Sequence, residues 1–394
     1  MSTGAELTEL IGKGASPRWQ GFAYGNEGML FVTSENVRDG YLDVSVPKFL
    51  PLAFHEKLSR TKLRRDDILV NLVGASIGRT CRVKNDLGPA NVNQAVAVFR
   101  LIDLRNAPYV EFFFQLPATI KRILEMQADA ARPNISLGNL RSFPIVLPPL
   151  EEQRSIVAIL SDVEALLGAL EQAIAKKRDI KQAAMQQLLT GQTRLPGFSG
   201  CWDKRRLGDV VSIYNGGTPR TGEPSFWDGN IAWCTPTDIT KTSGKYLAFT
   251  ERTISKAGLE GCSAQLLPTG AILLCTRATI GELKIAAREV CTNQGFKSLV
   301  ANKGVNNEFL YYTLLMMKAA MIERATGSTF LELSKRDTAS LSLAMPAYAE
   351  QSAIAIILSD MDAELSALEQ RRDKTRLLKQ GMMQELLTGR TRLV

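Results

Sequence analysis

The feature that most constrains this chain of 394 residues is a segment that occurs twice. Residues 150–195 align with residues 348–393 at a constant offset of 198 and without a gap, and 26 of the 46 aligned positions are identical. The stretches in front of the two copies correspond more faintly, for example at Asn93-Gln94 and Asn293-Gln294. A repeat at a fixed period indicates that one structural unit is used more than once. The order of segments is therefore variable, conserved, variable, conserved.

Charge follows the same division. The chain has 48 Lys and Arg residues against 40 Asp and Glu, a net charge of +8. We place the variable domains at residues 1–147 and 197–345, and each of them carries a net charge of +4. The conserved segments, residues 148–196 and 346–394, each have a net charge of zero. Because the whole positive excess lies in the variable domains, the pattern predicts that both of them bind a polyanion.

Each conserved segment is predicted to be one long helix. The first begins after Pro148-Pro149, has acidic residues in its first turn and stops at Gly191, which are favourable residues at those positions. Apolar residues recur in alternating steps of four and three, the pattern of a coiled-coil seam. The predicted seam consists of Leu160, Val163, Leu167 and Leu170 in the first helix, and of Leu358, Met361, Leu365 and Leu368 in the second.

Two such helices can serve simply as the core of a hairpin or as a dimer seam. A spacer role adds to that packing role. About 42 residues make a helix of about 60 Å, the length of about 18 base pairs of DNA. If the two helices pair antiparallel, they hold one variable domain at each end.

The variable domains are predicted to be α+β, with many short strands. Buried strands are expected at residues 67–73 and 270–275, and an alternating strand at residues 94–101. One helix is expected in each domain, at residues 108–128 and 307–326. Residues 74–78 resemble residues 277–281, which also supports two related domains.

Candidate DNA-binding side chains lie in the polar loops of the variable domains. Arg, Asn and Gln can each make two hydrogen bonds to one base edge, whereas Lys mostly holds phosphates. Residues 57–65 include five basic residues and are predicted to form a strip that faces phosphates. For any single candidate, a solvated or turn-stabilising role is the alternative. The candidates are Arg18, Lys62, Arg64, Arg79, Asn93, Gln94, Arg132, Asn134, Thr218, Arg220, Thr237, Arg277, Thr279, Asn293, Gln294 and Ser328.

No catalytic residue, metal or cofactor is expected. The chain lacks an Asn-Pro-Pro-aromatic motif, a glycine-rich cofactor loop and a P-loop. The single histidine, His55, and six scattered cysteines do not make a zinc pattern, and Asp66-Asp67 is interpreted as a turn rather than a Mg²⁺ site. Without an apolar run of eighteen residues, no membrane span is expected, and free thiols suit a cytoplasmic protein.

Several motifs bear on family. LPPLEEQ at residues 147–153 leads into the first helix, and LTG at residues 189–191 with RLPGF at residues 194–198 closes it. NGGTP at residues 215–219 and FWDG at residues 226–229 open the second variable domain. In combination these motifs resemble the specificity (S) subunits of type I restriction-modification enzymes, over essentially the whole chain. The sequence departs from the family pattern with MPAYAE at residues 345–350 and GASP at residues 14–17.

The resemblance implies a non-catalytic subunit in which each variable domain is a target-recognition domain. Each would read one part of a split double-stranded DNA target from the major groove, and the helices would set the gap. It also implies binding to two modification (M) subunits, which carry S-adenosylmethionine and methylate adenine, and to restriction (R) subunits in the full complex. The seam residues are then candidate contacts for the M subunits. The expected fold is pseudo-two-fold and circular, with an antiparallel coiled coil and the two termini close together.

Two other function classes stay open at this point. One is an enzyme, a nuclease or methyltransferase whose motifs have diverged. The other is a structural protein whose coiled coil joins partners without reading DNA.

Overall fold

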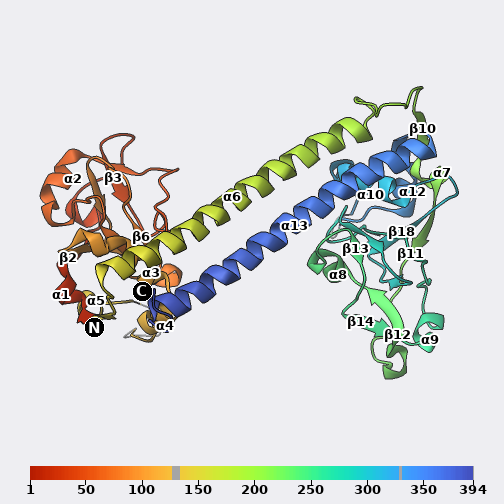
Figure 1. The fold of residues 1–394 in the computed structure, drawn as a ribbon. Coiled ribbons are helices and arrows are strands. Elements are labelled where there is room, and N and C mark those ends of the chain that lie inside the picture. Colours follow the sequence, from red (N-terminus) through yellow and green to blue (C-terminus); the bar gives the residue numbers. More distant parts are fainter. Residues whose placement is uncertain (127–133, 328–330, 394) are drawn as a thin grey trace. The chain divides into compact units, whose positions relative to one another are not determined.

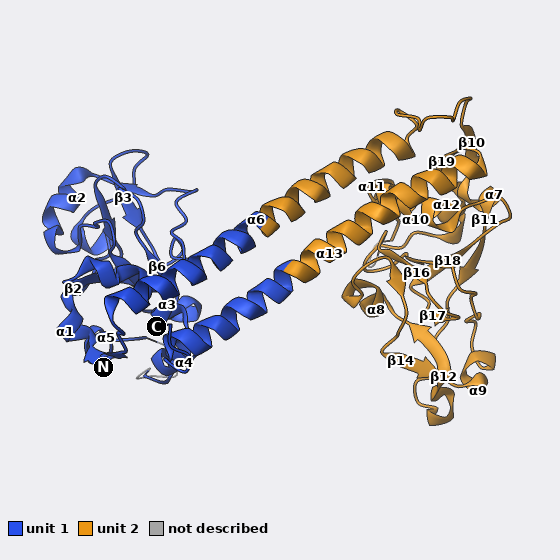
Figure 2. Cartoon of the chain, viewed as in Figure 1, with its two compact units in different colours: residues 1–169, 372–394 blue, residues 170–371 orange. Residues whose placement is uncertain are grey.

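The computed structural model describes residues 1–126, 134–327 and 331–393. It divides into two compact units, shown in Figure 2: unit 1 comprises Met1–Ala169 and Arg372–Val394, and unit 2 comprises Leu170–Arg371. Each unit contains one variable domain and part of each of two long helices, α6 (Leu150–Leu189) and α13 (Tyr348–Leu387). Both chain ends belong to unit 1 and are marked there in Figure 1.

The two long helices confirm the helices predicted for the conserved segments. Each has 40 residues, and each begins soon after the predicted proline. Their pairing within each unit is antiparallel. On the predicted seam, the side chains of Leu160, Leu170, Leu358 and Leu365 are buried, whereas those of Val163, Leu167, Met361 and Leu368 are partly buried. The seam is therefore largely internal to the chain.

Ion pairs link α6 to α13 and to the residues after α13 in unit 1. Glu152, near the start of α6, pairs with Arg392 just beyond α13, with an Nε–Oε1 distance of 2.6 Å. Glu164, further along α6, pairs with Lys379 at 2.6 Å. As residue numbers rise on one helix they fall on the other, which is the antiparallel arrangement.

Unit 2 contains the same pairs at the repeated positions. Adding 198 to Glu152 gives Glu350, which pairs with Arg194 at 2.6 Å, and Arg194 is the equivalent of Arg392. Likewise Asp362, the equivalent of Glu164, pairs with Lys181. Three identities between the conserved segments, at Glu152, Lys181 and Arg194, therefore have a structural cause, because the same pairs are made once in each unit.

The variable domain of unit 1 is built from short elements. They are β1 (Ser2–Thr3), α1 (Gly4–Leu7), β2 (Thr8–Lys13), η1 (Arg18–Gln20), β3 (Met29–Val32), β4 (Phe49–Leu50), α2 (Leu52–Lys57), η2 (Ser59–Thr61), β5 (Ile68–Asn71), η3 (Gly74–Ser76), β6 (Thr80–Arg82), β7 (Ala90–Val92), β8 (Val96–Leu101), η4 (Leu104–Asn106), α3 (Ala107–Gln115), α4 (Pro117–Glu125), α5 (Leu137–Ser142) and β9 (Pro144–Ile145). The strands form a four-stranded sheet in the order β2-β8-β5-β6, a three-stranded sheet in the order β4-β3-β7, and the pair β1-β9.

The variable domain of unit 2 repeats this plan. Its elements are β10 (Asp203–Arg206), α7 (Leu207–Val210), β11 (Val211–Asn215), η5 (Pro224–Phe226), β12 (Trp227–Cys234), α8 (Pro236–Lys241), β13 (Tyr246–Leu247), β14 (Arg252–Ile254), α9 (Lys256–Glu260), β15 (Ile272–Cys275), β16 (Leu283–Ala286), β17 (Cys291–Thr292), β18 (Phe296–Ala301), α10 (Asn307–Met316), α11 (Lys318–Arg324), α12 (Lys335–Ser340) and β19 (Ser342–Met345). The sheet orders are β11-β18-β15-β16-β13, β14-β12-β17 and β10-β19. Unit 2 thus adds β13 at the edge of the larger sheet.

The three predicted strands are present as β5, β15 and β8. Strand β8 differs from the prediction in one respect, because all six of its residues are buried rather than every second one. It lies between β2 and β5, and the smaller sheet and α3 cover the two faces of its sheet. A strand that is covered on both faces does not need an alternating pattern.

The prediction of one helix in each variable domain was wrong, because each helix is divided in two. Residues 107–125 form α3 and α4, which meet at Leu116 in an extended conformation (ψ 128°). Pro117 disfavours a helical conformation at the residue before it, and it is well tolerated as the first residue of α4. In unit 2, α10 and α11 meet at Met317 without a proline.

The larger sheet of each unit packs against the long helices. In unit 1, Ile68 of β5 and Phe99 of β8 share one buried cluster with Leu160 of α6 and Leu387 of α13. The corresponding cluster of unit 2 includes Ile272, Leu299, Leu189 and Leu358. The variable domains are therefore anchored on the conserved helices by a continuous core. In the described part of the chain, no helix has the length and apolar character needed to cross a membrane.

Candidate nucleic-acid interface

Four loops and one bridging segment meet at one end of the sheets in unit 1. The loop after β2 is tied to the β7–β8 loop, because Gly14 N donates to Asn93 O at 3.2 Å. The backbone N–H of Asn93 donates in turn to Val32, at the end of β3, at 2.9 Å. The loop after β5 joins them, because Leu72 N donates to Ala95 O at 2.8 Å. We call this set of segments, residues 14–18, 33–36, 72–79, 93–95 and 134–135, the loop cluster of unit 1.

Unit 2 has a loop cluster of the same construction. Gly217 N donates to Thr292 O at 2.8 Å, and Asn293 N donates to Cys234 O at 3.0 Å. Thr276 N donates to Gly295 O at 2.8 Å. The segments of this loop cluster are residues 216–222, 235–238, 276–281, 293–295 and 331–333. Two of these three backbone bonds are equivalent in the two units, so a shared frame holds two sets of loops whose side chains differ.

Glycine makes the close approach of these loops possible. A Cβ atom on Gly14 would lie 1.6 Å from the carbonyl oxygen of Val92, and one on Gly216 would lie 1.9 Å from that of Asn293. A side chain at either position would force the two loops apart. The glycines noted in the sequence at these points are therefore required by the geometry of the clusters.

Most of the candidate DNA-binding residues lie in the two clusters. The structure places there Arg18, Arg79, Asn93, Gln94 and Asn134 of unit 1, and Thr218, Arg220, Thr237, Arg277, Thr279, Asn293 and Gln294 of unit 2. Arg132 and Ser328 lie outside the described residues. Twelve of the sixteen candidates therefore lie in loops that meet in space, and their role in DNA binding stays a prediction.

The predicted phosphate-facing strip lies apart from the cluster of unit 1. Lys62 and Arg64 are outside its segments, and each is 3.7 Å from a carboxylate, of Glu56 and Glu9 respectively. Arg65 lies 3.9 Å from Asp66. These distances are long, so the pairs are weak and screened. The strip therefore keeps its positive charge, although it lies outside the cluster.

The asparagines of the two matching Asn-Gln pairs stabilise turns. The side-chain oxygen of Asn93 accepts a hydrogen bond from Ala95 N at 3.0 Å, and that of Asn293 accepts one from Gly295 N at 2.9 Å. These are Asx turns, the alternative considered for single candidates. The neighbouring Gln94 and Gln294 are exposed, and Gln294 accepts a hydrogen bond from the hydroxyl of Thr218.

The charged groups of the unit 2 cluster are partly paired. The guanidinium of Arg277 lies 2.7 Å from the carboxylate of Glu332, which Lys297 approaches at 3.2 Å. The hydrogen bond from Arg277, with a smaller contribution from Lys297, lowers the pKa of Glu332. Neither Glu332 nor Lys297 was a sequence candidate, because their partnership comes only from the fold. In unit 1, Trp19 follows Arg18 and is 90% exposed, and it was not a sequence candidate either.

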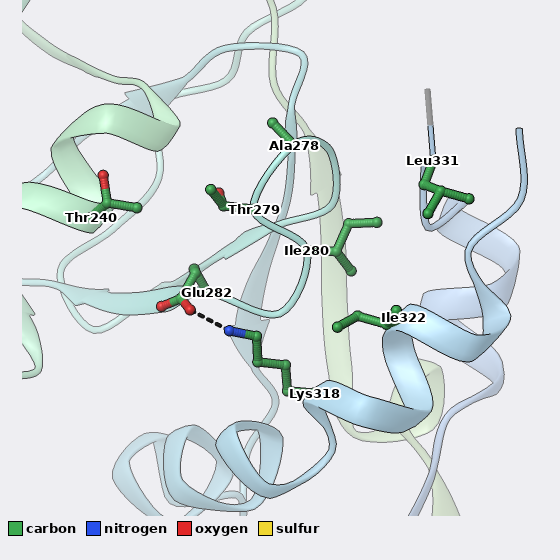
Figure 3. Close-up of a pocket in the computed structure, with 8 residues that line it drawn as sticks. All are labelled: Thr240, Ala278, Thr279, Ile280, Glu282, Lys318, Ile322 and Leu331. Carbon is green, nitrogen blue, oxygen red and sulfur yellow. Dashed lines mark hydrogen bonds and ion pairs between the residues drawn. The ribbon is translucent and has the colours of Figure 1, made fainter. Parts of the chain in front are cut away.

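A cavity of about 530 Å³ lies beside the unit 2 cluster, and Figure 3 shows its lining. Ala278, Thr279 and Ile280 form one wall, and Lys318 of α11, paired with Glu282, lies opposite. Ala278 has a backbone φ of 56°, which is uncommon for a residue with a side chain. The loop at residues 276–281 is thus held in a strained conformation next to an open space.

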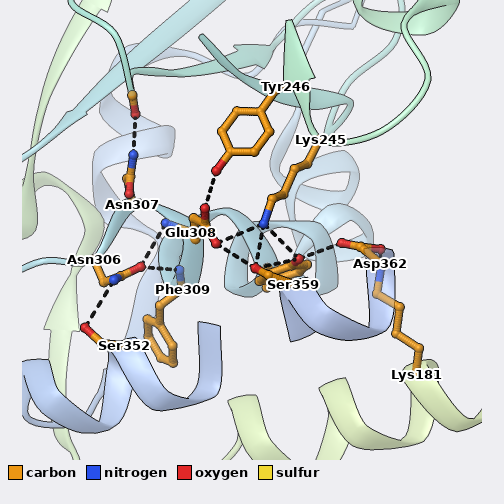
Figure 4. A network of polar contacts seen from close by, with 12 residues as sticks. Lys181, Lys245, Tyr246, Asn306, Asn307, Glu308, Phe309, Ser352, Ser359 and Asp362 are labelled. Carbon is orange, nitrogen blue, oxygen red and sulfur yellow. Dashed lines mark hydrogen bonds and ion pairs between the residues drawn. The ribbon is translucent and has the colours of Figure 1, made fainter. Parts of the chain in front are cut away.

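A polar network attaches the variable domain of unit 2 to α13 (Figure 4). Lys245 donates to Glu308 at 2.9 Å and to the hydroxyl of Ser359 on α13 at 2.5 Å. Tyr312 donates to Asp362 at 2.6 Å. Lys181 of α6 pairs with the same Asp362 and lies over the ring of Tyr312. These contacts fix the variable domain of unit 2 to both long helices.

The described residues do not assemble a catalytic centre. No group of three or more His, Cys, Asp and Glu side chains suitable for a metal ion occurs among them. Burial raises the pKa of Cys81, Cys275 and Cys291 to about 12, so these thiols stay protonated near neutral pH. His55 contacts the side chain of Asn91.

Comparison with known proteins gives a consistent result. The family model described as Type I restriction modification DNA specificity domain matches residues 26–180 and 200–377. The MjaIX specificity subunit of Methanocaldococcus jannaschii is 35% identical over 163 residues, which are 41% of this chain and only 38% of that subunit. The putative MjaX specificity subunit of the same organism is 23% identical over 374 residues, 91% of this chain and 86% of that one.

Two solved structures share the fold. The S subunit of a type I restriction-modification system from M. genitalium matches with a TM-score of 0.59 at 14% identity, over 98% of this chain and 94% of that one. A chain from the structural work on complex assembly and conformational transition of the type I R-M system matches with a TM-score of 0.62 at 18% identity, over 98% and 96%.

Proposed function

We propose, since this chain belongs to the type I restriction-modification DNA specificity family, that its two loop clusters read two separate parts of one DNA target. The chain is a specificity subunit, the non-catalytic component that recognises the DNA target within the complex. The proposal goes further, by assigning one part of the target to each unit.

The observation that carries the proposal is the repeated frame with unlike side chains. The two clusters share equivalent backbone hydrogen bonds, such as Leu72 N to Ala95 O and Thr276 N to Gly295 O, and the loops that these bonds hold differ in sequence. Where one cluster has Val73 and Asn134, the other has Arg277 and Glu332. Since base edges are read by side chains in the major groove, two frames with different side chains suit two different base sequences.

The long helices supply the spacing in this proposal. Each has 40 residues, which is about 60 Å of helix and about 18 base pairs of B-form DNA. A helix held by regular partners along its length is a stiff element, and the ion pairs and seam described above supply such partners. The helices then set the length of the unspecified gap between the two parts.

Partners of the chain are also proposed rather than given by its structure. We propose docking of two M subunits, with R subunits in the full complex, on the outer faces of the helices. Leu160 and Leu358 are fully buried inside the chain, so these seam residues are not available to a partner. Exposed apolar residues are better candidates, such as Leu377, 69% accessible, and Leu378 beside it in unit 1. Ile356 on α13 provides an exposed apolar residue in unit 2.

Domain exchange tests the assignment of one part of the target to each unit. Residues 197–345 are replaced by the second recognition domain of another family member, and the chain is expressed with its M subunits. Mapping of methylated adenines should show one part of the target changed and the other part retained. The matched control replaces residues 1–147 and should change the opposite part. A change in both parts from either exchange contradicts separate reading.

A further inference from the structure

Three charged side chains form a short series of ion pairs at the centre of the unit 2 loop cluster. Nη2 of Arg277 lies 2.7 Å from Oε2 of Glu332, and Nζ of Lys297 lies 3.2 Å from Oε1 of the same carboxylate. The side chain of Lys297 is only 8% exposed, whereas that of Arg277 is 45% exposed. The carboxylate of Glu332 therefore contacts the buried ammonium of Lys297 on one side. On its other side it contacts the accessible guanidinium of Arg277.

The backbone frame does not require these charges. Arg277 and Glu332 face each other across an isolated β-bridge, and the same bridge in unit 1 joins Val73 to Asn134. The hydrogen bonds next to the bridge agree, since Ile135 N donates to Leu72 O in unit 1 and Leu333 N to Thr276 O in unit 2. In this register the position of Arg277 in unit 2 is equivalent to that of Val73 in unit 1. The sequence similarity of the two loops had instead aligned Arg277 with Gly74.

The third position of the series also differs between the units. Strand β8 begins at Val96 and strand β18 at Phe296, directly after the matching turns, so Lys297 corresponds to Ala97. Unit 1 thus folds the same loop with Val73, Asn134 and Ala97 in place of three charges. The shared frame therefore does not require these ion pairs, and Arg277, unlike the buried Arg100 of unit 1, is 45% exposed and accessible to DNA.

The chemistry of the series suits the reading of a base. A guanidinium has five N–H donors, and Arg is the side chain that most often contacts guanine, through two hydrogen bonds to O6 and N7. A long flexible side chain loses conformational freedom when it binds, and that loss is smaller if a partner already holds it in place. Glu332 provides such a partner for Arg277.

The loop itself is also under strain. Ala278, the residue after Arg277, has a φ of 56°. Figure 3 shows Ala278 and the following Thr279 on the wall of the open cavity. Strained backbone is concentrated at functional sites rather than at structural turns.

We infer that Arg277 reads a guanine in the part of the target that belongs to unit 2, that Glu332 is its positioning residue, and that Lys297 anchors Glu332. The inference rests on the proposed function, since it names one base contact of one proposed recognition domain. No corresponding guanine contact is made by Val73 and Asn134 at the same place in unit 1.

The first test replaces Arg277 by lysine. This substitution keeps the positive charge and removes the planar guanidinium that can donate two parallel hydrogen bonds to one base. In the complex with M subunits, methylation mapping of R277K should show one G·C position of the unit 2 part losing its preference for guanine by about tenfold or more. All other positions should be unchanged. The matched control is R205K, on strand β10 outside the loop cluster, which should leave the whole target unchanged.

The second test asks whether Glu332 positions Arg277 or only stabilises the fold. E332Q should weaken preference at the same base position as R277K, and it should add no further loss of preference in the R277K background. A uniform loss of methylation at every position, in either single variant, overturns the inference.

The two levels of the proposal fail in different ways. If R277K leaves the target unchanged while exchange of residues 197–345 alters one part, then the inference about Arg277 is wrong and separate reading stands. If the exchange alters neither part or both, the proposed function itself is wrong.

Discussion

Arg100 and Asp67 form a buried ion pair in unit 1 that illustrates how the two domains diverged at single residues. Nε of Arg100 lies 2.7 Å from Oδ1 of Asp67, and the two side chains are 7% and 0% exposed. The hydrogen bond to Asp67 raises the pKa of Arg100, so the guanidinium remains charged. In unit 2 the same strand positions are Val300 and Ala271, two apolar residues. The frame thus accepts either a charged pair or an apolar pair there.

This comparison predicts the effects of substitution. D67A leaves a buried guanidinium without its partner, so it should lower the free energy of unfolding by about 3–5 kcal/mol. The double variant D67A/R100V carries the residues of unit 2 and should recover most of that loss. Urea unfolding of the purified chain measures both. A double variant less stable than D67A would show that the two domains do not share the frame at this point.

At the scale of elements, the two long helices are held by ion pairs that occur twice. Glu152 is one such residue, and the hydrogen bond from Arg392 lowers its pKa below the ordinary value of 4.5. A carboxyl with a lowered pKa in the folded state stabilises the fold above its ordinary pKa. That stabilisation is lost as the pH falls through the lowered value.

The pH dependence of stability tests this pair. Between about pH 5 and pH 3, the thermal midpoint of the natural chain should fall more steeply than that of E152Q, because the variant has no carboxylate to protonate there. E151Q is the matched control, since Glu151 is exposed and pairs only with Arg154 on its own helix. It should keep the steep dependence. Equal slopes for E152Q and the natural chain would mean that this contact does not stabilise the fold.

The elements also show what sequence can and cannot provide. The helices α6 and α13 were predicted because a seam and a repeat extend over 40 residues. The break between α3 and α4 could have been predicted from Pro117, because proline disfavours a helical residue before it. The break at Met317 has no such residue in the sequence. Strand β8 was found, but its burial on both faces depends on a second sheet that no local pattern reveals.

The candidate site was predictable to the level of loops. Polar loops with Arg, Asn, Gln and Thr pointed to the segments that form the two clusters. The partnership of Arg277 with Glu332 joins residues 55 positions apart in the sequence, through a strand register that only the fold sets. The residue type of Asn93 predicts a base contact, and the fold adds a second role, because its side-chain oxygen accepts a hydrogen bond that stabilises a turn.

At the scale of the whole molecule, the repeat provides two like domains on a shared helical support. The chain crosses from one unit to the other within α6 and returns within α13, so that its first and last residues both belong to unit 1. The segment that follows α6 leads into β10 of unit 2, whereas the equivalent segment after α13 belongs to unit 1. Two direct repeats in sequence thus form two units, each of which combines one variable domain with parts of both long helices.

The central claim is that the helices set the distance between two recognition sites on DNA. Inserting seven residues after Lys176 and seven after Lys374 lengthens both helices at equivalent places and keeps the seam, because seven residues are one seam repeat. The added helix is about 10 Å, or about three base pairs. The ion pairs on either side of the insertions, Glu164 with Lys379 and Asp362 with Lys181, stay in register.

Methylation mapping of that variant, in complex with its M subunits, tests the claim most directly. The account predicts that both parts of the target keep their base sequences while the gap between them grows by about three base pairs. A target whose gap is unchanged, or whose base sequences change, would contradict it.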